Sequence, residues 1–154
     1  IVASLVGSEM CIRDRCQFMP SSFINYATDW DKDGSKNIWT SKPDVFASAA
    51  NYLKRVGWSN QITWGRKVFI GNYNGKIDEK KYNLLSYWAS KGILKANKDK
   101  LPNVKVKARL IIPDGYKNYG YLAYKNFDSL LNWNRSNYFA IAVGTLADTI
   151  KENN

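Results

Sequence analysis

The spacing of apolar residues changes twice along the chain, and this change limits the fold more than any other feature of the sequence. Residues 41–57 and 136–151 carry apolar side chains at intervals of three or four, which places them on one face of a helix. Between them, residues 67–70, 104–112 and 119–124 are short and rich in β-branched or aromatic side chains. The sequence therefore predicts an α+β protein, mainly helical, with a small antiparallel sheet of three strands.

The two long helical segments also carry start and stop signals. Ser41 precedes Pro43 and Asp44, which favour a first helical turn, and Gly57 stands where a helix commonly ends. The apolar stripe predicted for this helix comprises Val45, Ala49, Tyr52, Leu53 and Val56. The stripe predicted for the last helix comprises Phe139, Val143, Leu146, Ala147 and Ile150.

Two shorter helices and a turn complete the expected elements. A short helix is expected from Ser21 or Ser22 to Ala27, because either serine can cap it. Asp78 is expected to cap a further helix that runs to about Lys91 and ends at Gly92, and residues 71–75 are expected to form a turn.

Composition excludes several classes of function. The 154 residues contain no histidine, which removes His-based triads and most catalytic zinc sites. The formal net charge of +10 favours an anionic partner: nucleic acid, a phospholipid surface or an acidic cell-wall polymer. The 22 aromatic residues suit stacking on sugars or on single-stranded bases, with packing in the core as the alternative. The lysines are spread along the chain, which argues against nucleic acid.

The first sixteen residues differ from the rest. The string SLVGSEMCIRDR within them resembles a translated sequencing adaptor, and both cysteines, Cys11 and Cys16, lie here. We therefore expect residues 1–16 to be non-native and residues 17–154 to form one partial domain. The cysteines then give no information on redox compartment.

The segment DWDKDGSKNIW at 29–39 has the spacing of an EF-hand loop, with carboxylates at its first, third and fifth positions and Gly34 at the sixth. Clustered carboxylates repel one another unless a cation is present. The sequence therefore predicts a structural Ca²⁺ site in an EF-hand-like loop over 29–44; the alternative is an Asx-rich turn, with Asp44 as an ordinary charge at a helix start. The expected ligands are Asp29, Asp31, Asp33, Ser35 through its carbonyl, and Asp44.

Glutamate occurs only at Glu9, Glu79 and Glu152. Glu9 lies in the segment of doubtful origin, Glu79 in the first turn of an expected helix and Glu152 near the chain end. From composition and spacing alone, the chain shows no catalytic acid.

Four blocks together resemble the lytic murein transglycosylase B family. They are QFMPSS at 17–22, the Asp-rich loop, ASAANYL at 47–53 and NFDSLLNWNRSNYFAIAVGTLA at 126–147. The resemblance implies a lysozyme-like fold that cleaves the glycan bond between N-acetylmuramic acid and N-acetylglucosamine and leaves an anhydro-muramic end. In that family a single Glu acts as acid and then base, in a block before the one that matches Gln17. This chain lacks that block, so we expect a domain truncated at its N-terminus, no catalytic residue and little or no activity.

The resemblance also assigns substrate contacts. Gln17 matches a cleft glutamine beside the catalytic acid, and Phe18 and Met19 shape the same wall. Tyr52 matches a tyrosine on the substrate side, and Asn134 matches an asparagine that contacts the muramyl N-acetyl group. The alternatives are a surface polar residue for Gln17, a core residue for Tyr52 and a helix N-cap for Asn134.

The expected partner is a peptidoglycan glycan strand, with no nucleic acid and with the protein a monomer. The resemblance implies a location in the bacterial periplasm. It also implies association with a membrane, which can be the outer membrane, through an N-terminal anchor that we expect this chain to lack. The rival classes are a non-catalytic glycan- or calcium-binding module and, less favoured, a single-strand nucleic-acid binder.

Overall fold

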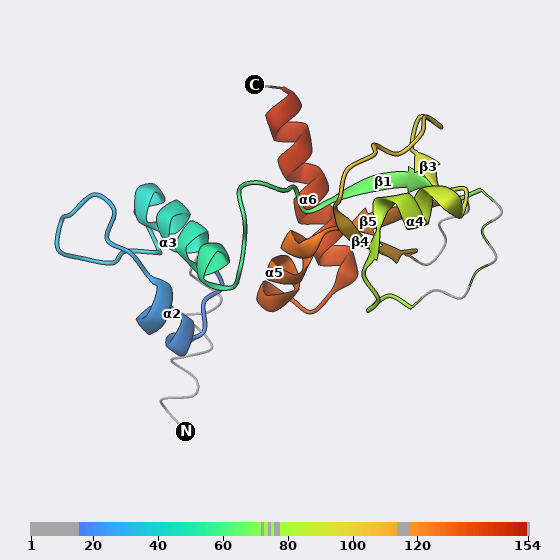
Figure 1. The fold of residues 1–154 in the computed structure, drawn as a ribbon. Coiled ribbons are helices and arrows are strands. Elements are labelled where there is room, and N and C mark those ends of the chain that lie inside the picture. Colours follow the sequence, from blue (N-terminus) through green and yellow to red (C-terminus); the bar gives the residue numbers. More distant parts are fainter. Residues whose placement is uncertain (1–15, 72, 74, 76–77, 114–117, 154) are drawn as a thin grey trace. The chain divides into compact units, whose positions relative to one another are not determined.

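The computed structural model describes residues 16–71, 73, 75, 78–113 and 118–153. The chain forms two compact units, residues 1–57 and 58–154, and each is treated by itself. Figure 1 labels the helices and strands. Within the described ranges, no helix is both long enough and apolar enough to cross a membrane.

In its described residues, the first unit contains two helices joined by the Asp-rich loop (Figure 1). Helix α2 spans Pro20–Tyr26 and helix α3 spans Lys42–Arg55. The Oγ of Ser41 accepts a hydrogen bond from the backbone N–H of Asp44 at 3.4 Å, and Gly57 follows α3 with a φ of 102°, a conformation that glycine adopts without steric cost. The predicted helix over 41–57 is therefore confirmed.

The two helices of this unit are joined by side-chain hydrogen bonds. The backbone N–H of Thr28 donates to the hydroxyl of Ser48 at 2.9 Å, and the amide of Asn51 donates to the carbonyl of Tyr26, also at 2.9 Å. The groups on α3 that make these bonds are the side chains of Ser48 and Asn51. The predicted apolar stripe of α3 is therefore only part of what holds the two helices together.

The second unit is built on a five-stranded antiparallel sheet in the order β2-β4-β5-β1-β3. Its strands are β1 (Gly65–Phe69), β2 (Asn83–Leu84), β3 (Leu94–Lys95), β4 (Lys107–Ile111) and β5 (Tyr119–Ala123). The three predicted strands are the central ones. The two edge strands were missed because two residues are too few to show an alternating pattern.

Helix α4 spans Leu85–Ser90 and covers the core side of the sheet. Leu85 and Trp88 pack with buried residues of the central strands, and the indole N–H of Trp88 donates to the carbonyl of Ala108 at 2.8 Å. The core comprises Val68, Ile70, Leu85, Trp88, Ile93, Leu101, Ala108, Leu110, Leu122 and Tyr124.

The predicted start of this helix at Asp78 is wrong. Asp78 instead closes a turn, because its side chain accepts from the N–H of Lys80 at 3.0 Å and its carbonyl accepts from the N–H of Lys81 at 3.0 Å. Leu84 then pairs with Lys107 in the sheet. An aspartate that bonds its own backbone two residues on has the same sequence signature as a helix cap. The predicted end is confirmed, since Gly92 has a φ of 81°.

Two helices close the chain: α5 at Lys125–Trp133 and α6 at Asn137–Glu152. The predicted helix over 136–151 is confirmed, but its predicted buried face is wrong. Val143, Leu146 and Ile150 are exposed, whereas the buried residues of α6 are Ala140, Ile141 and Gly144.

The indole of Trp64 explains the buried face of α6. This ring is almost fully buried, lies against Gly144, and donates its N–H to the carboxylate of Asp148 at 2.9 Å. A large flat ring needs a small residue opposite it, so the small side chains of α6 face inward. The predicted turn over 71–75 falls partly, and residues 1–15 fall wholly, outside the described residues.

An ion pair between buried Arg109 and half-buried Asp128 connects the sheet to α5. The guanidinium of Arg109 on β4 lies 3.0 Å from the carboxylate of Asp128 on α5, and the hydroxyl of Tyr82 donates to the same carboxylate at 3.0 Å. Burial, together with Asp128, raises the pKa of Tyr82 to about 12, although Arg109 opposes the shift.

We predict that Gly144→Ala destabilises the protein. In an exposed helix interior this change would gain about 1 kcal/mol. Here the added methyl group meets the indole of Trp64, which its own burial and its bond to Asp148 hold in place, so overpacking should cost about 1–3 kcal/mol. Urea unfolding measures the change, with Ala142→Gly on the exposed face of α6 as control. An unfolding free energy for Gly144→Ala equal to or above the wild-type value would contradict the packing.

We also predict that Tyr82 makes stability fall in alkali. Because its folded pKa is raised from 10 to about 12, its contribution is complete below pH 10 and is lost as the pH rises toward 12. Tyr82→Phe should therefore flatten the decline of unfolding free energy over this range, measured by urea unfolding at half-unit pH steps. Tyr87→Phe, at an exposed tyrosine, should leave the slope unchanged. Equal slopes for wild type and Tyr82→Phe would refute the prediction.

Candidate functional site

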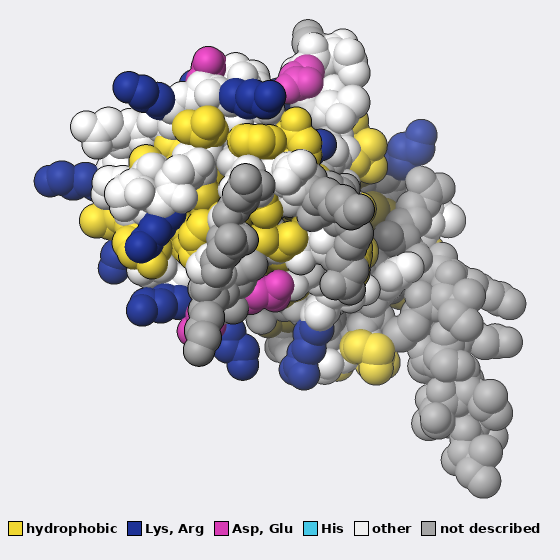
Figure 2. Space-filling view, turned by 90° about the vertical axis from the view of Figure 1, so that its right-hand side faces the viewer, with side chains coloured by type: hydrophobic (Ala, Val, Ile, Leu, Met, Phe, Trp, Pro, Cys, Tyr) yellow, Lys and Arg dark blue, Asp and Glu magenta, His cyan; other side chains and the backbone are white. Residues whose placement is uncertain are grey.

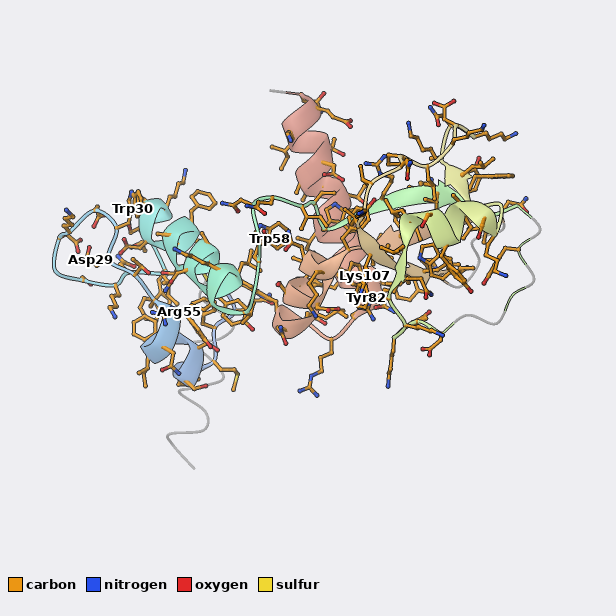
Figure 3. All side chains as sticks on the ribbon, in the orientation of Figure 1. Asp29, Trp30, Arg55, Trp58, Tyr82 and Lys107 are labelled. Atoms are coloured by element: carbon orange, nitrogen blue, oxygen red, sulfur yellow. The ribbon has the colours of Figure 1, made fainter. Side chains whose placement is uncertain are left out.

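Three carboxylates of the first unit converge where the loop meets α3. One carboxylate oxygen from each of Asp29, Asp31 and Asp44 lies within 4.8 Å of the others. Figure 3 shows Asp29 and Trp30 in the loop beside the start of α3. Oxygen atoms at such spacing can share one hard cation such as Ca²⁺.

Asp44 is fully buried in the first turn of α3. One of its oxygens accepts from the N–H of Trp30 at 2.7 Å and the other from the N–H of Asn37 at 2.8 Å. The bond from Trp30 is the main cause that lowers the pKa of Asp44; burial acts in the opposite direction. Asp44 is therefore a buried carboxylate that stays ionised at neutral pH.

Asp29 has one oxygen satisfied and one not. Its Oδ2 accepts from the N–H of Gly34 at 3.0 Å, but its Oδ1 is buried and finds no hydrogen-bond partner among the described residues. A buried carboxylate oxygen without a partner is costly, and a cation removes that cost. The donor set therefore fits a divalent ion.

The loop conformation depends on two residues with positive φ, Lys32 at 62° and Gly34 at 88°. Glycine adopts this conformation freely, which accounts for glycine at the sixth position. Asp33 is not in the carboxylate group, and its Oδ1 accepts from the N–H of Ser35 at 2.8 Å. The loop thus contains both an Asx turn at Asp33 and a carboxylate cluster, and the ion itself stays a prediction.

Two of the residues that the resemblance assigns to substrate, Phe18 and Tyr52, form a cluster of aromatic rings with Tyr26. The rings of Phe18 and Tyr52 lie 5.8 Å apart, and Tyr26 meets Tyr52 edge-on at 4.9 Å. Phe18 is buried and Tyr52 half-buried, and burial raises the pKa of the Tyr52 hydroxyl. Met19 is 61% exposed. The first unit therefore brings Gln17, Phe18 and Met19 to the same end of the α2–α3 pair as Tyr52.

Gln17 has an unusual backbone. Its φ is 53°, in the left-handed region that costs a residue with a Cβ about 1–3 kcal/mol, and its side chain is exposed. The same region is occupied by Lys32, Lys98 and Asn118, so the conformation does not by itself identify a binding residue. The next residue, Phe18, is buried in the unit.

Asn134 belongs to the second unit and is the C-terminal cap residue of α5. Its interpretation as a helix N-cap is wrong, because Ser136 caps α6 by accepting from the N–H of Phe139 at 3.3 Å. The Asn134 side chain is exposed and makes no hydrogen bond within the described part of the chain. Its amide is therefore open to a ligand.

The described glutamates are not arranged as catalytic acids. Both Glu79 and Glu152 are exposed, and Glu79 accepts a hydrogen bond from the amide of Asn137 at 3.1 Å. The general acid of a glycosidase commonly lies in a pocket lined by apolar side chains, whereas both of these carboxylates are exposed.

Sequence reasoning missed two contributors to this region. Tyr26 supports Tyr52, and the backbone of Asn37 holds Asp44. Tyr26 has no periodic signal because α2 is too short, whereas Asn37 is a turn residue that bonds its own chain at Trp39 and Thr40. The turn propensity of Asn37 was the available signal.

Comparison with known proteins places this geometry in a family. Residues 5–148 match the family described as Transglycosylase SLT domain. The membrane-bound lytic murein transglycosylase B of Escherichia coli K12 is 32% identical over 142 residues, which cover 87% of this chain and 36% of that protein.

Solved structures agree. SltB3 from Pseudomonas aeruginosa, in complex with NAG-anhNAM-pentapeptide, superposes with a TM-score of 0.81 at 30% identity, over 97% of this chain and 45% of its own. The Escherichia coli lytic transglycosylase Slt35 in complex with calcium gives a TM-score of 0.70 at 29% identity, over 89% of this chain and 43% of its own.

The chain thus spans less than half the length of these relatives. The match nevertheless extends over nearly all of its residues and includes both the carboxylate loop and Asn134. The predicted α+β, lysozyme-like fold with a small antiparallel sheet is confirmed, and so is the resemblance to lytic murein transglycosylase B. The chain belongs to the transglycosylase SLT domain family.

Proposed function

We propose that this chain holds the glycan strand of peptidoglycan for a lytic transglycosylase, which cleaves between N-acetylmuramic acid and N-acetylglucosamine and leaves an anhydro-muramic end. The observation that carries the proposal is the likeness, over 97% of the chain, to SltB3 in complex with NAG-anhNAM-pentapeptide.

Each proposed contact suits a glycan. The half-buried ring of Tyr52, supported by Phe18, offers an edge and a hydroxyl to a sugar, and exposed Met19 adds apolar contact. Gln17 and Asn134 offer exposed amides, which can both donate and accept. We assign Asn134 to the N-acetyl group of the muramyl residue.

We further propose that this chain binds glycan without cleaving it. In the mechanism that the family resemblance implies, one Glu donates a proton to the leaving oxygen and then removes a proton, assisted by the N-acetyl group of the substrate. Neither Glu79 nor Glu152 has a setting suited to this task. The described residues therefore position the sugar, and the acid belongs to a block that precedes Gln17 in the family.

The charge distribution supports an acidic polymer as partner. Residues 58–154 contain 16 Lys or Arg against 7 Asp or Glu, whereas residues 1–57 contain 7 against 6. Figure 2 shows Lys and Arg side chains spread around one face, with few Asp or Glu among them. The spread suits a polymer with scattered carboxylates better than the continuous phosphates of nucleic acid. We propose a monomer in the bacterial periplasm, held there by a membrane anchor outside the described residues.

We propose Ca²⁺ as a structural ion held by Asp29, Asp31 and Asp44. The unpartnered buried oxygen of Asp29 supports this assignment, and a relative has been crystallised with calcium. The ion would neutralise three clustered carboxylates and fix the loop to the start of α3. Asp33 and Ser35 are the further ligands expected from the sequence; the Oδ1 of Asp33 already accepts from the N–H of Ser35, and we propose the carbonyl of Ser35 as an additional ligand.

We predict that the purified chain binds peptidoglycan but does not lyse it. Sedimentation with purified cell walls measures binding, and turbidity measures lysis. Asn134→Ala should weaken binding about five- to tenfold, since one hydrogen bond is worth about 1 kcal/mol. Asn103→Ala, at another exposed asparagine of the same unit, should have no effect. Clear lysis by the chain would refute the proposal that it binds the glycan without cleaving it. Absence of binding would refute the glycan strand as the substrate.

We predict that calcium binds the loop and raises the melting temperature, because a ligand that binds only the folded state stabilises it. Calorimetry should show one site that is lost in Asp29→Asn and Asp31→Asn, while Asp33→Asn retains it. Sodium chloride at equal ionic strength is the control for screening. If millimolar calcium produces neither heat nor a thermal shift, the metal proposal is wrong.

A further inference from the structure

The segment over 79–82 in the second unit is bonded to three other elements. The carbonyl of Glu79 accepts from the guanidinium of Arg109 on β4 at 2.9 Å. Its carboxylate accepts from the side-chain amide of Asn137, the first residue of α6, at 3.1 Å. The hydroxyl of Tyr82 donates to Asp128 on α5 at 3.0 Å. One short segment therefore connects the sheet, α5 and α6.

Arg109 is the centre of these contacts. It is only 8% exposed, and besides Glu79 it binds Asp128 in a 3.0 Å ion pair. Its guanidinium also lies over the rings of Phe127 and Tyr82, at 5.3 and 5.7 Å from their centres. An ion pair with one buried, planar partner restricts both side chains more than a fully exposed pair does. Figure 3 shows Tyr82 next to the helices that end the chain.

The two helices held by these contacts flank Asn134. Asp128 lies in α5, six residues before Asn134, and Asn137 lies three residues after it. The backbone between the helices is short and bonded to itself: the N–H of Asn134 donates to the carbonyl of Leu130 at 3.1 Å, and that of Ser136 donates to the carbonyl of Asn134 at 2.8 Å. The position of the Asn134 amide therefore depends on how α5 and α6 are fixed.

We propose that Glu79, Tyr82, Arg109, Asp128 and Asn137 form a brace that sets the position of Asn134 for the muramyl N-acetyl group. They are positioning residues: they act through Asn134 and do not touch the sugar. The inference rests on the role proposed above for Asn134.

Helix α5 has a second attachment, which should keep the brace variants folded. Asn126, fully buried at the start of α5, accepts from the N–H of Ser59 at 2.8 Å and donates to the carbonyls of Ser59 and Ile62. Asn126 and Asp128 both lie in the first turn of α5, so loss of the Asp128 contacts leaves that turn attached through Asn126. The remaining brace contact, from Asn137 to Glu79, lies at the start of α6, three residues after Asn134. Loss of the brace should therefore change the position of Asn134 more than it changes stability.

The test combines brace variants with Asn134→Ala in the full 154-residue chain. Calorimetry with a soluble N-acetylglucosaminyl–N-acetylmuramyl oligosaccharide gives the affinity, and thermal unfolding gives the stability. Asp128→Asn should weaken binding three- to tenfold, Tyr82→Phe two- to threefold, and neither should weaken it further once Asn134→Ala is present. Lys125→Ala removes an exposed ion-pair partner of the same Asp128 and should stay within twofold of wild type.

A second measurement addresses position directly. The side-chain amide signals of Asn134 in an ¹⁵N spectrum should shift and show greater motion in Asp128→Asn, with no such change in Lys125→Ala. Conservative Arg109→Lys, which keeps the charge but not the planar fork, should fall between wild type and Asp128→Asn in both measurements.

The outcomes separate the two proposals. If Asp128→Asn lowers the melting temperature but leaves affinity and the Asn134 signals unchanged, the brace is structural only and the inference is wrong. The inference is also wrong if the fold-losses in affinity of Asp128→Asn and Asn134→Ala multiply when the two substitutions are combined. Failure of the proposed function is different: the wild type does not bind the oligosaccharide, or Asn134→Ala binds it with full affinity, and either result removes the brace's role as well.

Discussion

The organisation of the first unit depends on one buried, ionised carboxylate. Asp44 stands at the start of α3, and its two oxygens accept backbone N–H groups from opposite ends of the loop, at Trp30 and Asn37. These bonds offset the cost of burying the charge and close a long polar loop on a helix start, where the dipole also favours an anion. The same arrangement places Asp29 and Asp31 beside it, so the side chain that organises the loop also supplies its candidate ion site.

The second unit is held differently, by large rings and by a partly buried ion pair. Trp64 packs on a glycine of α6, and Arg109 pairs with Asp128 across the sheet and α5. Both contacts join residues far apart in sequence. Polar connections at such distances give directions that apolar packing alone does not give, and here they fix the two helices on either side of Asn134.

Local signals account for what the sequence predicted well. Ser41, Gly57 and Ser136 mark helix ends by chemistry that operates within a few residues, and these bounds are confirmed. Of the four aspartates predicted to share an ion, Asp29, Asp31 and Asp44 come together, whereas Asp33 does not. What failed depends on distant partners. Asp78 has the signature of a cap but forms a turn, because the following residues pair with β4. The inward face of α6 is set by Trp64, some eighty residues earlier. The contacts assigned to Gln17, Tyr52 and Asn134 came from family likeness, since no spacing rule identifies a sugar-binding amide.

The uneven charge of the two units has a consequence for kinetics. Nearly all of the excess positive charge lies in residues 58–154, whereas Gln17, Tyr52 and the carboxylate loop lie in a unit close to neutral. Long-range attraction to an acidic polymer governs the rate of encounter, and short-range hydrogen bonds and ring contacts govern how long the complex lasts. Under the proposed function, we expect ionic strength to act mainly on the rate of encounter, through the charge of residues 58–154, and sugar identity to act mainly on the lifetime of the complex, through the contacts proposed for Gln17, Tyr52 and Asn134.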